Sequence, residues 1–203
     1  LLIDYGLAPS SPPRYPSEAP FVEHAIFTHA HIDHIGMAPW LVGNHQTTLH
    51  GTHLTADLAG LMWKDTYKVS NIEGYPLPWD RRDEDEAKEA WIEHDFEEWN
   101  NHDNWKWRFL SAGHIPGAAM IEIETPEFKI LHSGDMDTRP SPNTLGATPI
   151  ECDILLLEGT YSGKEHPDRK QEEARFVAKV IEVVERGGIA VIPAFASGRG
   201  QDI

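Results

Sequence analysis

The sequence has 203 residues, of which 40% are hydrophobic and 25% are charged, as in ordinary globular chains and unlike disordered ones. No apolar run reaches the roughly 18 to 20 residues that a membrane-spanning helix needs, and the single Cys152 excludes an internal disulfide framework and favours a reducing, cytoplasmic location. Asp and Glu number 33 against 17 Lys and Arg, a formal net charge of −16, whereas nucleic-acid binders are normally basic.

The spacing of apolar residues predicts a succession of short elements. In chain order these are strand Leu1–Ile3, a proline-rich loop over 8–20, strand Val22–Thr28, helix Ile35–Val42, strand Thr47–Thr52, helix Leu54–Val69, helix Asp80–Glu98, strands Trp105–Leu110, Ala119–Ile123, Phe128–His132 and Ile154–Leu157, helix Arg169–Arg186 and strand Ile189–Pro193. We expect the last two strands to be buried, because both are continuously apolar. We expect Asp80–Glu98 to be an amphipathic helix with a solvated acidic face.

Many strands followed by a βα alternation predict an α/β sandwich joined to the start of a second α/β unit. The chain opens inside an expected strand without an initiating Met, and it stops at Ile203 where another helix should begin. We therefore expect a fragment at both ends.

Four residues of metal-binding type fall within six positions, where strand Val22–Thr28 ends: His29, His31, Asp33 and His34. Alternation along an extended chain places His29 and His31 on one side, where both could bind one metal ion. Asp33 and His34 lie past the bend and could reach a second ion. Imidazole and carboxylate ligands together suit zinc, with manganese or iron as alternatives.

Two distant residues could complete such a site. His114 lies in a small-residue loop after a strand, and Asp135 follows another strand directly in Ser133-Gly134-Asp135. A carboxylate can bridge two metal ions, which a single imidazole nitrogen cannot. The remaining histidines that precede His114 are expected to be surface or capping residues: His24, His45, His50, His53, His94 and His102.

These motifs resemble those of the metallo-β-lactamase superfamily, with Asp4, the His29–His34 cluster, His114 and Asp135 in the places of its four motifs. The resemblance implies an αββα sandwich with two zinc ions at one edge. It implies that His29, His31 and His114 hold the first ion. By the same resemblance Asp33 and His34 hold the second, Asp135 bridges the two, and Asp4 orients the histidine loop.

Two later segments resemble the β-CASP ribonuclease branch of this superfamily. Leu155-Leu156-Leu157-Glu158-Gly159-Thr160-Tyr161 resembles the opening of the β-CASP cassette, and the segment from Ile192 to Gln201 resembles a strand-turn-helix inside it. The resemblance divides the chain into an incomplete metallo-β-lactamase domain, 1–161, and the beginning of a β-CASP domain, 162–203. It assigns to Glu158 an interaction with a histidine that lies later in the family's chains.

The implied reaction is hydrolysis of RNA by a hydroxide that bridges two metal ions, with Asp33 orienting the water or accepting its proton. Arg199 and His166 are candidate substrate contacts. The family supplies two further histidines after the cassette, a ligand of the second ion and a general acid, and the sequence ends before them. We therefore expect the 203 residues alone to have weak activity and an incomplete second site.

Several alternatives remain open at this stage. A thioesterase or lactonase of the same fold would share every metal ligand, a DNA-directed β-CASP nuclease would share the later motifs too, and a metal-free scaffold subunit would have lost ligands. A homodimer is also left open, and no membrane partner is expected. A chain with a net negative charge could still bind RNA if bound metal ions make the potential at the site positive. It could also do so if the host is salt-loving, because the Debye length falls to about 3 Å at 1 M salt and surface charges are then screened.

Overall fold

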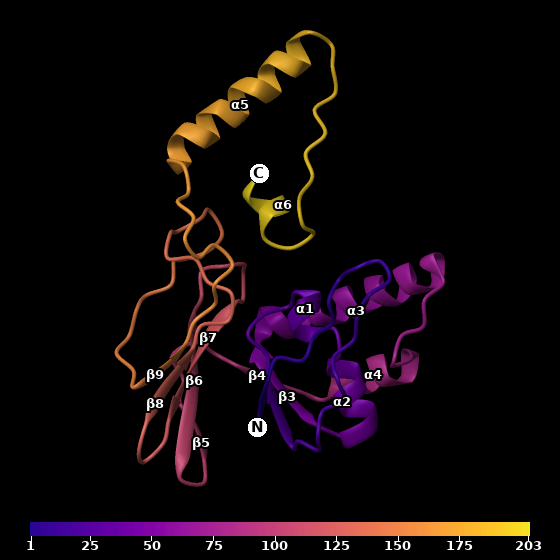
Figure 1. Ribbon diagram of the computed structural model, residues 1–203, viewed down its shortest axis with the longest axis vertical. Helices are drawn as coiled ribbons and strands as arrows, with labels where there is room; N and C mark the ends of the chain where they lie inside the picture. Colours follow the sequence, from indigo (N-terminus) through magenta and orange to yellow (C-terminus); the bar gives the residue numbers. More distant parts are fainter.

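The computed structural model describes residues 1–203 and contains two β-sheets that pack face to face (Figure 1). The first sheet is parallel, with the order β1 (Leu2–Ile3), β2 (His24–Ile26), β3 (Thr48–Thr52) and β4 (Trp91–His94). The second has the order β5 (Asn100–His102), β6 (Trp105–Ser111), β7 (Ala119–Glu124), β8 (Lys129–His132) and β9 (Ile154–Leu156). Its pairs are antiparallel except for the parallel pair β8–β9.

Four helices cover the outer face of the first sheet (Figure 1). They are α1 (Ile32–Ile35), α2 (Ala38–His45), α3 (His53–Glu73) and α4 (Arg81–Glu89). Side-chain alternation along β2 and β3 turns Phe27 and Leu49 toward these helices. There they pack with Trp63, which is fully buried and donates its indole N–H to the carbonyl of Ile35 over 2.9 Å. Trp63 therefore links α3 to the turn that carries the histidine cluster.

The opposite side-chain face of β2 forms the layer between the sheets. Ile26 is fully buried there against Trp107, Phe109 and Ile121 of the second sheet. These three side chains all belong to β6 and β7, whose register aligns Phe109 with Ile121. The apolar contact between the sheets fixes the relative positions of the strand ends that carry the candidate site residues.

The outer face of the second sheet is covered differently. At one end, loop residues such as Ala147 pack over Leu110 and Leu131. At the other end the carboxylate of Glu122 is buried, accepts a 2.6 Å hydrogen bond from Arg108 and lies 3.4 Å from Lys129. The mixed α/β sandwich expected from the sequence is confirmed, with helices on one outer face and a loop on the other.

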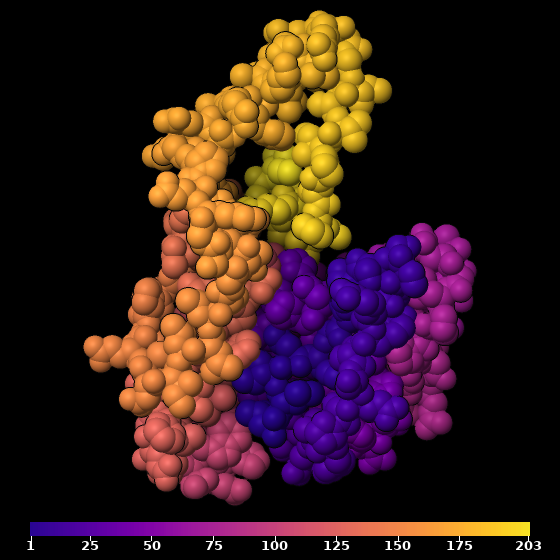
Figure 2. All heavy atoms as spheres, in the orientation of Figure 1, coloured from indigo at the N-terminus to yellow at the C-terminus, as the bar shows by residue number.

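The last forty residues form an arm that stands off this two-layer body (Figures 1 and 2). Asp168 caps α5 (Arg169–Glu185) by accepting from the backbone N–H of Gln171, and Gly187, with φ 75°, follows its end. An irregular segment then returns to α6 (Arg199–Asp202), which lies above α1. Figure 2 shows a hollow between α5 and this returning segment. None of the helices is both long enough and apolar enough to cross a membrane.

The helix predicted over Asp80–Glu98 is wrong beyond its first half. Asp80 starts α4 with a capping box, but the helix ends at Glu89 and Trp91–His94 form β4 beside β3. Trp91 packs in an edge contact with Phe27 and stacks near Trp63. Pairing with β3 and burial of this indole outweigh the helical spacing of the aromatic residues, which was incidental.

Three other predicted elements also differ from the structure. The helix expected at Ile35–Val42 is two helices, and α1 begins at Ile32, so that Asp33 lies on a helical turn. The strand at Ile154–Leu157 forms, but its side chains are between 41% and 60% exposed, because it is the edge strand. The segment Ile189–Pro193 is neither a strand nor buried, with Ile189 89% exposed, since no neighbouring strand lies against it.

The role of Trp63 can be tested by two alanine substitutions on the same helix. We predict that Trp63→Ala lowers the free energy of unfolding by about 3 to 5 kcal/mol, the usual cost of removing a buried aromatic side chain. Leu61→Ala, where the side chain is 59% exposed, should change it by less than about 0.5 kcal/mol. Denaturant unfolding monitored by circular dichroism measures both values, and equal losses would contradict the packing described here.

Candidate metal centre

The residues predicted to bind metal converge at one end of the sandwich, although they come from separate loops. His29 and His31 follow β2, His114 lies between β6 and β7, and Asp135 follows β8. One ligand atom from each of these four residues lies within 4.8 Å of all the others. Both sheets contribute to the group, so the packing between them is what assembles it.

The three imidazoles of this group meet through single ring nitrogens. His31 Nδ1 lies 3.1 Å from His29 Nε2 and 3.1 Å from His114 Nε2. Asp135 places one carboxylate oxygen 4.0 Å from His29 Nε2 and 3.7 Å from His114 Nε2. Three imidazole nitrogens and a carboxylate oxygen are a donor set that divalent zinc accepts, and the residues present therefore fit a divalent metal ion.

The carboxylate of Asp4 determines which nitrogen His29 offers. Asp4 accepts hydrogen bonds from the backbone N–H and the hydroxyl of Thr28, at 2.8 and 2.7 Å. Because the single hydroxyl proton of Thr28 points to Asp4, its oxygen can only accept from His29 Nδ1, 3.0 Å away. The proton of neutral His29 is thereby assigned to Nδ1, and Nε2 is left with a lone pair facing the group.

The same carboxylate also orients His34. Asp4 Oδ2, which also accepts from the Thr28 hydroxyl, lies 2.7 Å from His34 Nδ1. His34 Nε2 then faces Asp135 at 3.5 Å and Asp33 at 3.8 Å. Asp135 thus presents one oxygen to His29 and His114 and the other to His34. This is the arrangement that a carboxylate between two neighbouring cations would need.

Charges within the group shift the pKa values in opposite directions. Burial, followed by the charges of the neighbouring imidazoles, lowers the pKa of His29 well below its ordinary value. Burial also acts to lower the pKa of His34, but its hydrogen bonds to Asp135 and Asp4 outweigh that effect and raise the pKa to about 10. The hydrogen bond from His34 in turn lowers the pKa of Asp135 to about 2. The protonated, positively charged form of His34 is therefore favoured between the carboxylates of Asp4 and Asp135.

Two glycines allow the histidine loop to pack this closely. A Cβ on Gly6 would lie 1.9 Å from the carbonyl oxygen of Asp33, so the chain after β1 can cross the loop only without a side chain. Gly134 has φ 52°, and a Cβ there would lie 2.8 Å from Thr28 Cβ. Neither position tolerates alanine without movement of the loop.

Glu158 lies beside the group and not within it. Its two carboxylate oxygens accept from the backbone N–H groups of Met136, at 3.3 Å, and Thr160, at 2.8 Å. Its negative charge acts on His114, where it opposes the lowering of the pKa by burial. Glu158 is therefore fixed between the segment that carries Asp135 and the turn after β9.

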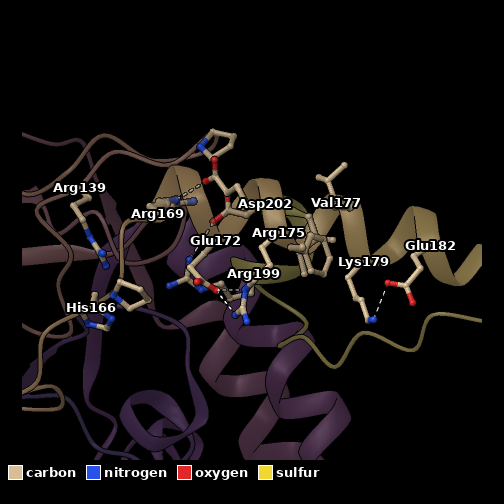
Figure 3. Close-up of a pocket in the computed structure, with 16 residues that line it drawn as sticks. Arg139, His166, Arg169, Glu172, Arg175, Val177, Lys179, Glu182, Arg199 and Asp202 are labelled. Atoms are coloured by element: carbon tan, nitrogen blue, oxygen red, sulfur yellow. Dashed lines mark hydrogen bonds and ion pairs between the residues drawn. The ribbon is translucent and has the colours of Figure 1, made fainter.

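Arg199 and His166, the predicted substrate contacts, lie away from the metal-type ligands in a cleft of about 1240 Å³ between α5 and α6 (Figure 3). Five basic and four acidic side chains line this cleft: Arg139, Arg169, Arg175, Lys179, Arg199, Glu172, Glu173, Glu182 and Asp202. The returning segment itself passes close to the candidate centre, since Phe195 lies 5.9 Å from His31 between ring centroids.

Sequence reasoning missed two features of this end of the molecule and one elsewhere. Thr28 precedes His29 directly, and its position between a strand and a histidine was the available signal for its role. Gly6 carried no signal, since only the fold brings it to Asp33. His50, expected at the surface or at a helix cap, is buried between the sheets, because β3 places it on the face opposite Leu49.

Comparison with known proteins agrees with this geometry. A model of the metallo-beta-lactamase superfamily matches residues 2–150. The chain is 34% identical over its whole length to half of Probable RNase MJ4 of Methanocaldococcus jannaschii, and 31% identical over its whole length to 42% of RNase aCSPSF2 of Saccharolobus solfataricus. Over 92% of its length it is 34% identical to a quarter of cleavage and polyadenylation specificity factor subunit 3 of Dictyostelium discoideum. The chain spans half or less of the length of these relatives.

The orienting role of Asp4 leads to a direct test. We predict that Asp4→Asn weakens zinc binding by about 10- to 100-fold, as is usual when a partner behind a histidine ligand is removed, because the amide NH2 group would replace one of the two oxygens that accept from Thr28 and His34. Asp57→Asn, at an exposed position of α3, should leave the affinity unchanged. Equilibrium dialysis against a zinc buffer measures both, and equal affinities for Asp4→Asn and the unmodified chain would refute the role.

Proposed function

Since the chain belongs to the metallo-β-lactamase superfamily, we propose that it is part of a metal-dependent phosphodiesterase that hydrolyses RNA. The ribonuclease branch expected from the sequence motifs is confirmed by the relatives named as RNases. RNA is proposed as the substrate because of those relatives and because of the chemistry of the centre.

The observation that carries the proposal is the convergence of three ring nitrogens on one point. His29 Nε2 and His114 Nε2 both lie 3.1 Å from His31 Nδ1. A neutral His31 can share a proton with only one of these two nitrogens, so neutral rings leave one of the two contacts without a hydrogen bond. A divalent cation between the three nitrogens would satisfy all of them at once.

We assign one zinc ion to His29, His31 and His114, and a second to Asp33 and His34, with Asp135 between them. Bound zinc would lower the pKa of water and stabilise negative charge on a phosphoryl group. Manganese or iron would fit the same donors. The side chains of the protein then have the tasks of holding these positions and of moving protons.

We assign to Asp33 the transfer of a proton from attacking water. Its carboxylate is 53% exposed, more than the other acidic and imidazole groups of the centre, and lies 3.8 Å from His34 Nε2. The carboxylate of Asp33 can therefore contact solvent and also bind at the assigned second metal position. Glu158 would hold neighbouring groups in position and would not transfer protons itself, since both its oxygens already accept hydrogen bonds from backbone N–H groups.

The cleft beside α6 supports a polyanionic substrate. It holds five of the 17 Lys and Arg residues but only four of the 33 Asp and Glu residues, in a chain with a net charge of −16. Arg199 is 60% exposed and lies 3.7 Å from Asp202, so its guanidinium can turn to a phosphate. The balance of charge in the cleft therefore differs from that of the rest of the surface, and it favours phosphate at this place.

The proposal is tested with the natural protein in its full length, loaded with zinc. We expect it to cleave labelled RNA, and to act more slowly on DNA of the same sequence and on a generic thioester and lactone. Its rate on RNA should fall more than about 100-fold in His31→Ala, because loss of a ligand should exceed the 10- to 100-fold cost of losing an outer partner.

His53→Ala is the matched control, since His53 is 60% exposed and lies outside the centre; its rate should equal that of the unmodified protein. Turnover of the thioester or lactone with no cleavage of RNA would overturn the proposal. Cleavage of DNA in preference to RNA would retain the phosphodiesterase and reject the ribonuclease.

A further inference from the structure

A second group of histidines lies between the two sheets. The alternation of β2, β3 and β4 turns His24, His50 and His94 to the same side as Ile26, toward the second sheet. His102, at the end of β5, faces His24 from that sheet with ring centroids 5.5 Å apart. These four residues, here called the inter-sheet histidines, are not part of the candidate metal centre.

The first three are joined by hydrogen bonds into a row. His24 Nδ1 lies 3.0 Å from His50 Nε2, and His50 Nδ1 lies 2.9 Å from His94 Nε2. His50 thus uses both of its nitrogens, one on each side, whereas the ring nitrogens of the candidate centre meet around one point. A row of this kind does not enclose one metal ion, and the only group of convergent ligands is the one described above.

The surroundings of the row provide no carboxylate next to its central ring. His50 is 9% exposed and meets Trp107 of β6 edge-on, and Trp107 also contacts His94. Acidic groups act only on the outer members: Glu98 on His94, and Asp103, 3.7 Å from the ring of His102. Glu23 lines a small cleft with His24 and His102, and His53 adds a like charge near His94.

Proton counting shows how this row responds to acid. A neutral imidazole has one donor and one acceptor, so three neutral rings satisfy both hydrogen bonds with all protons pointing the same way. One added proton on His50 keeps both bonds, but it places a charge between the sheets without a counter-ion. A second proton, on a neighbouring ring, makes two N–H groups face each other, so that one hydrogen bond of the row is lost.

We propose that the inter-sheet histidines form an acid-sensitive latch: neutral rings pack against the second sheet, and protonated rings force the sheets apart because their charge has no counter-ion between the layers. The hydrogen bonds of the row join β2, β3 and β4 within the first sheet, and the row contacts the second sheet through Trp107 and His102. Because the candidate metal centre draws ligands from both sheets, release of the latch would also separate those ligands.

The direction of the effect follows from the titration of His50. Burial, and then the charges of His94, His24 and His102, lower its pKa to about 4, from a value near 6.5 in an unfolded chain. Between these pH values the unfolded chain binds more protons than the folded one, so stability rises with pH. The contribution is fully present above about pH 6.5 and is lost as the pH falls toward about 4.

Acid unfolding of the protein tests the latch. Circular dichroism would be recorded from pH 8 to pH 3, at saturating zinc and again with a chelator, for the unmodified protein, His50→Gln and His166→Gln. Glutamine can donate and accept a hydrogen bond but does not titrate in this range. We expect His50→Gln to shift the midpoint of acid unfolding downward by about half a pH unit or more, and the exposed His166→Gln to leave it unchanged.

Histidine ring resonances of the unmodified protein give a second measurement, which decides the matter if His50→Gln does not fold. The ring of His50 should remain neutral well below pH 6 and change only as the structure is lost. Equal midpoints for His50→Gln and the unmodified protein would overturn the latch. So would a His50 ring that titrates near pH 6.5 in the folded protein.

Discussion

The carboxylate of Asp4 is the constraint on which the rest of the centre depends. It lies at the end of β1 and accepts from Thr28 and from His34, so it determines the orientation of two imidazoles at once. Through the hydroxyl of Thr28 it assigns the proton of His29 to Nδ1. Without this acceptor, the imidazoles could rotate or exchange tautomers, and their Nε2 atoms would have no defined direction.

The fold turns this local arrangement into a centre by bringing strand ends together. The first sheet supplies the histidine loop, and the second sheet supplies His114 and Asp135 from the ends of β6 and β8. The apolar layer of Ile26, Trp107 and Phe109 fixes the distance between the histidine loop and the strand ends of the second sheet. The packing of the core and the geometry of the candidate centre are therefore coupled, because loosening the layer would move the candidate ligands as well as core side chains.

Much of this could be predicted from the sequence, for reasons that are local. The candidate ligands His29, His31, Asp33 and His34 fall within six residues of the chain, and strong strand patterns place His114 and Asp135 at strand ends. The parts that failed depend on distant contacts. The helix expected through Trp91 ends at Glu89 because β3 offers a pairing edge, which no local spacing records.

The same limit explains the missed roles of Gly6, Thr28 and His50. Each acts through a residue that only the folded chain brings near: Asp33 for Gly6, Asp4 for Thr28, and His24 and His94 for His50. The apolar run at Ile189 fails as a predictor for a different reason, because hydrophobicity alone does not determine burial. Burial needs a covering surface, and the structure places none over that residue.

Anomalous diffraction from crystals grown with zinc tests the central claim most directly. A zinc peak should lie between His29 Nε2, His31 Nδ1 and His114 Nε2, at about 2.0 to 2.1 Å from each nitrogen, with Asp4 still bound to Thr28 and His34. Coordination of zinc through His29 Nδ1, or zinc bound elsewhere with these three nitrogens vacant, would contradict the claim that Asp4 sets the geometry of the centre.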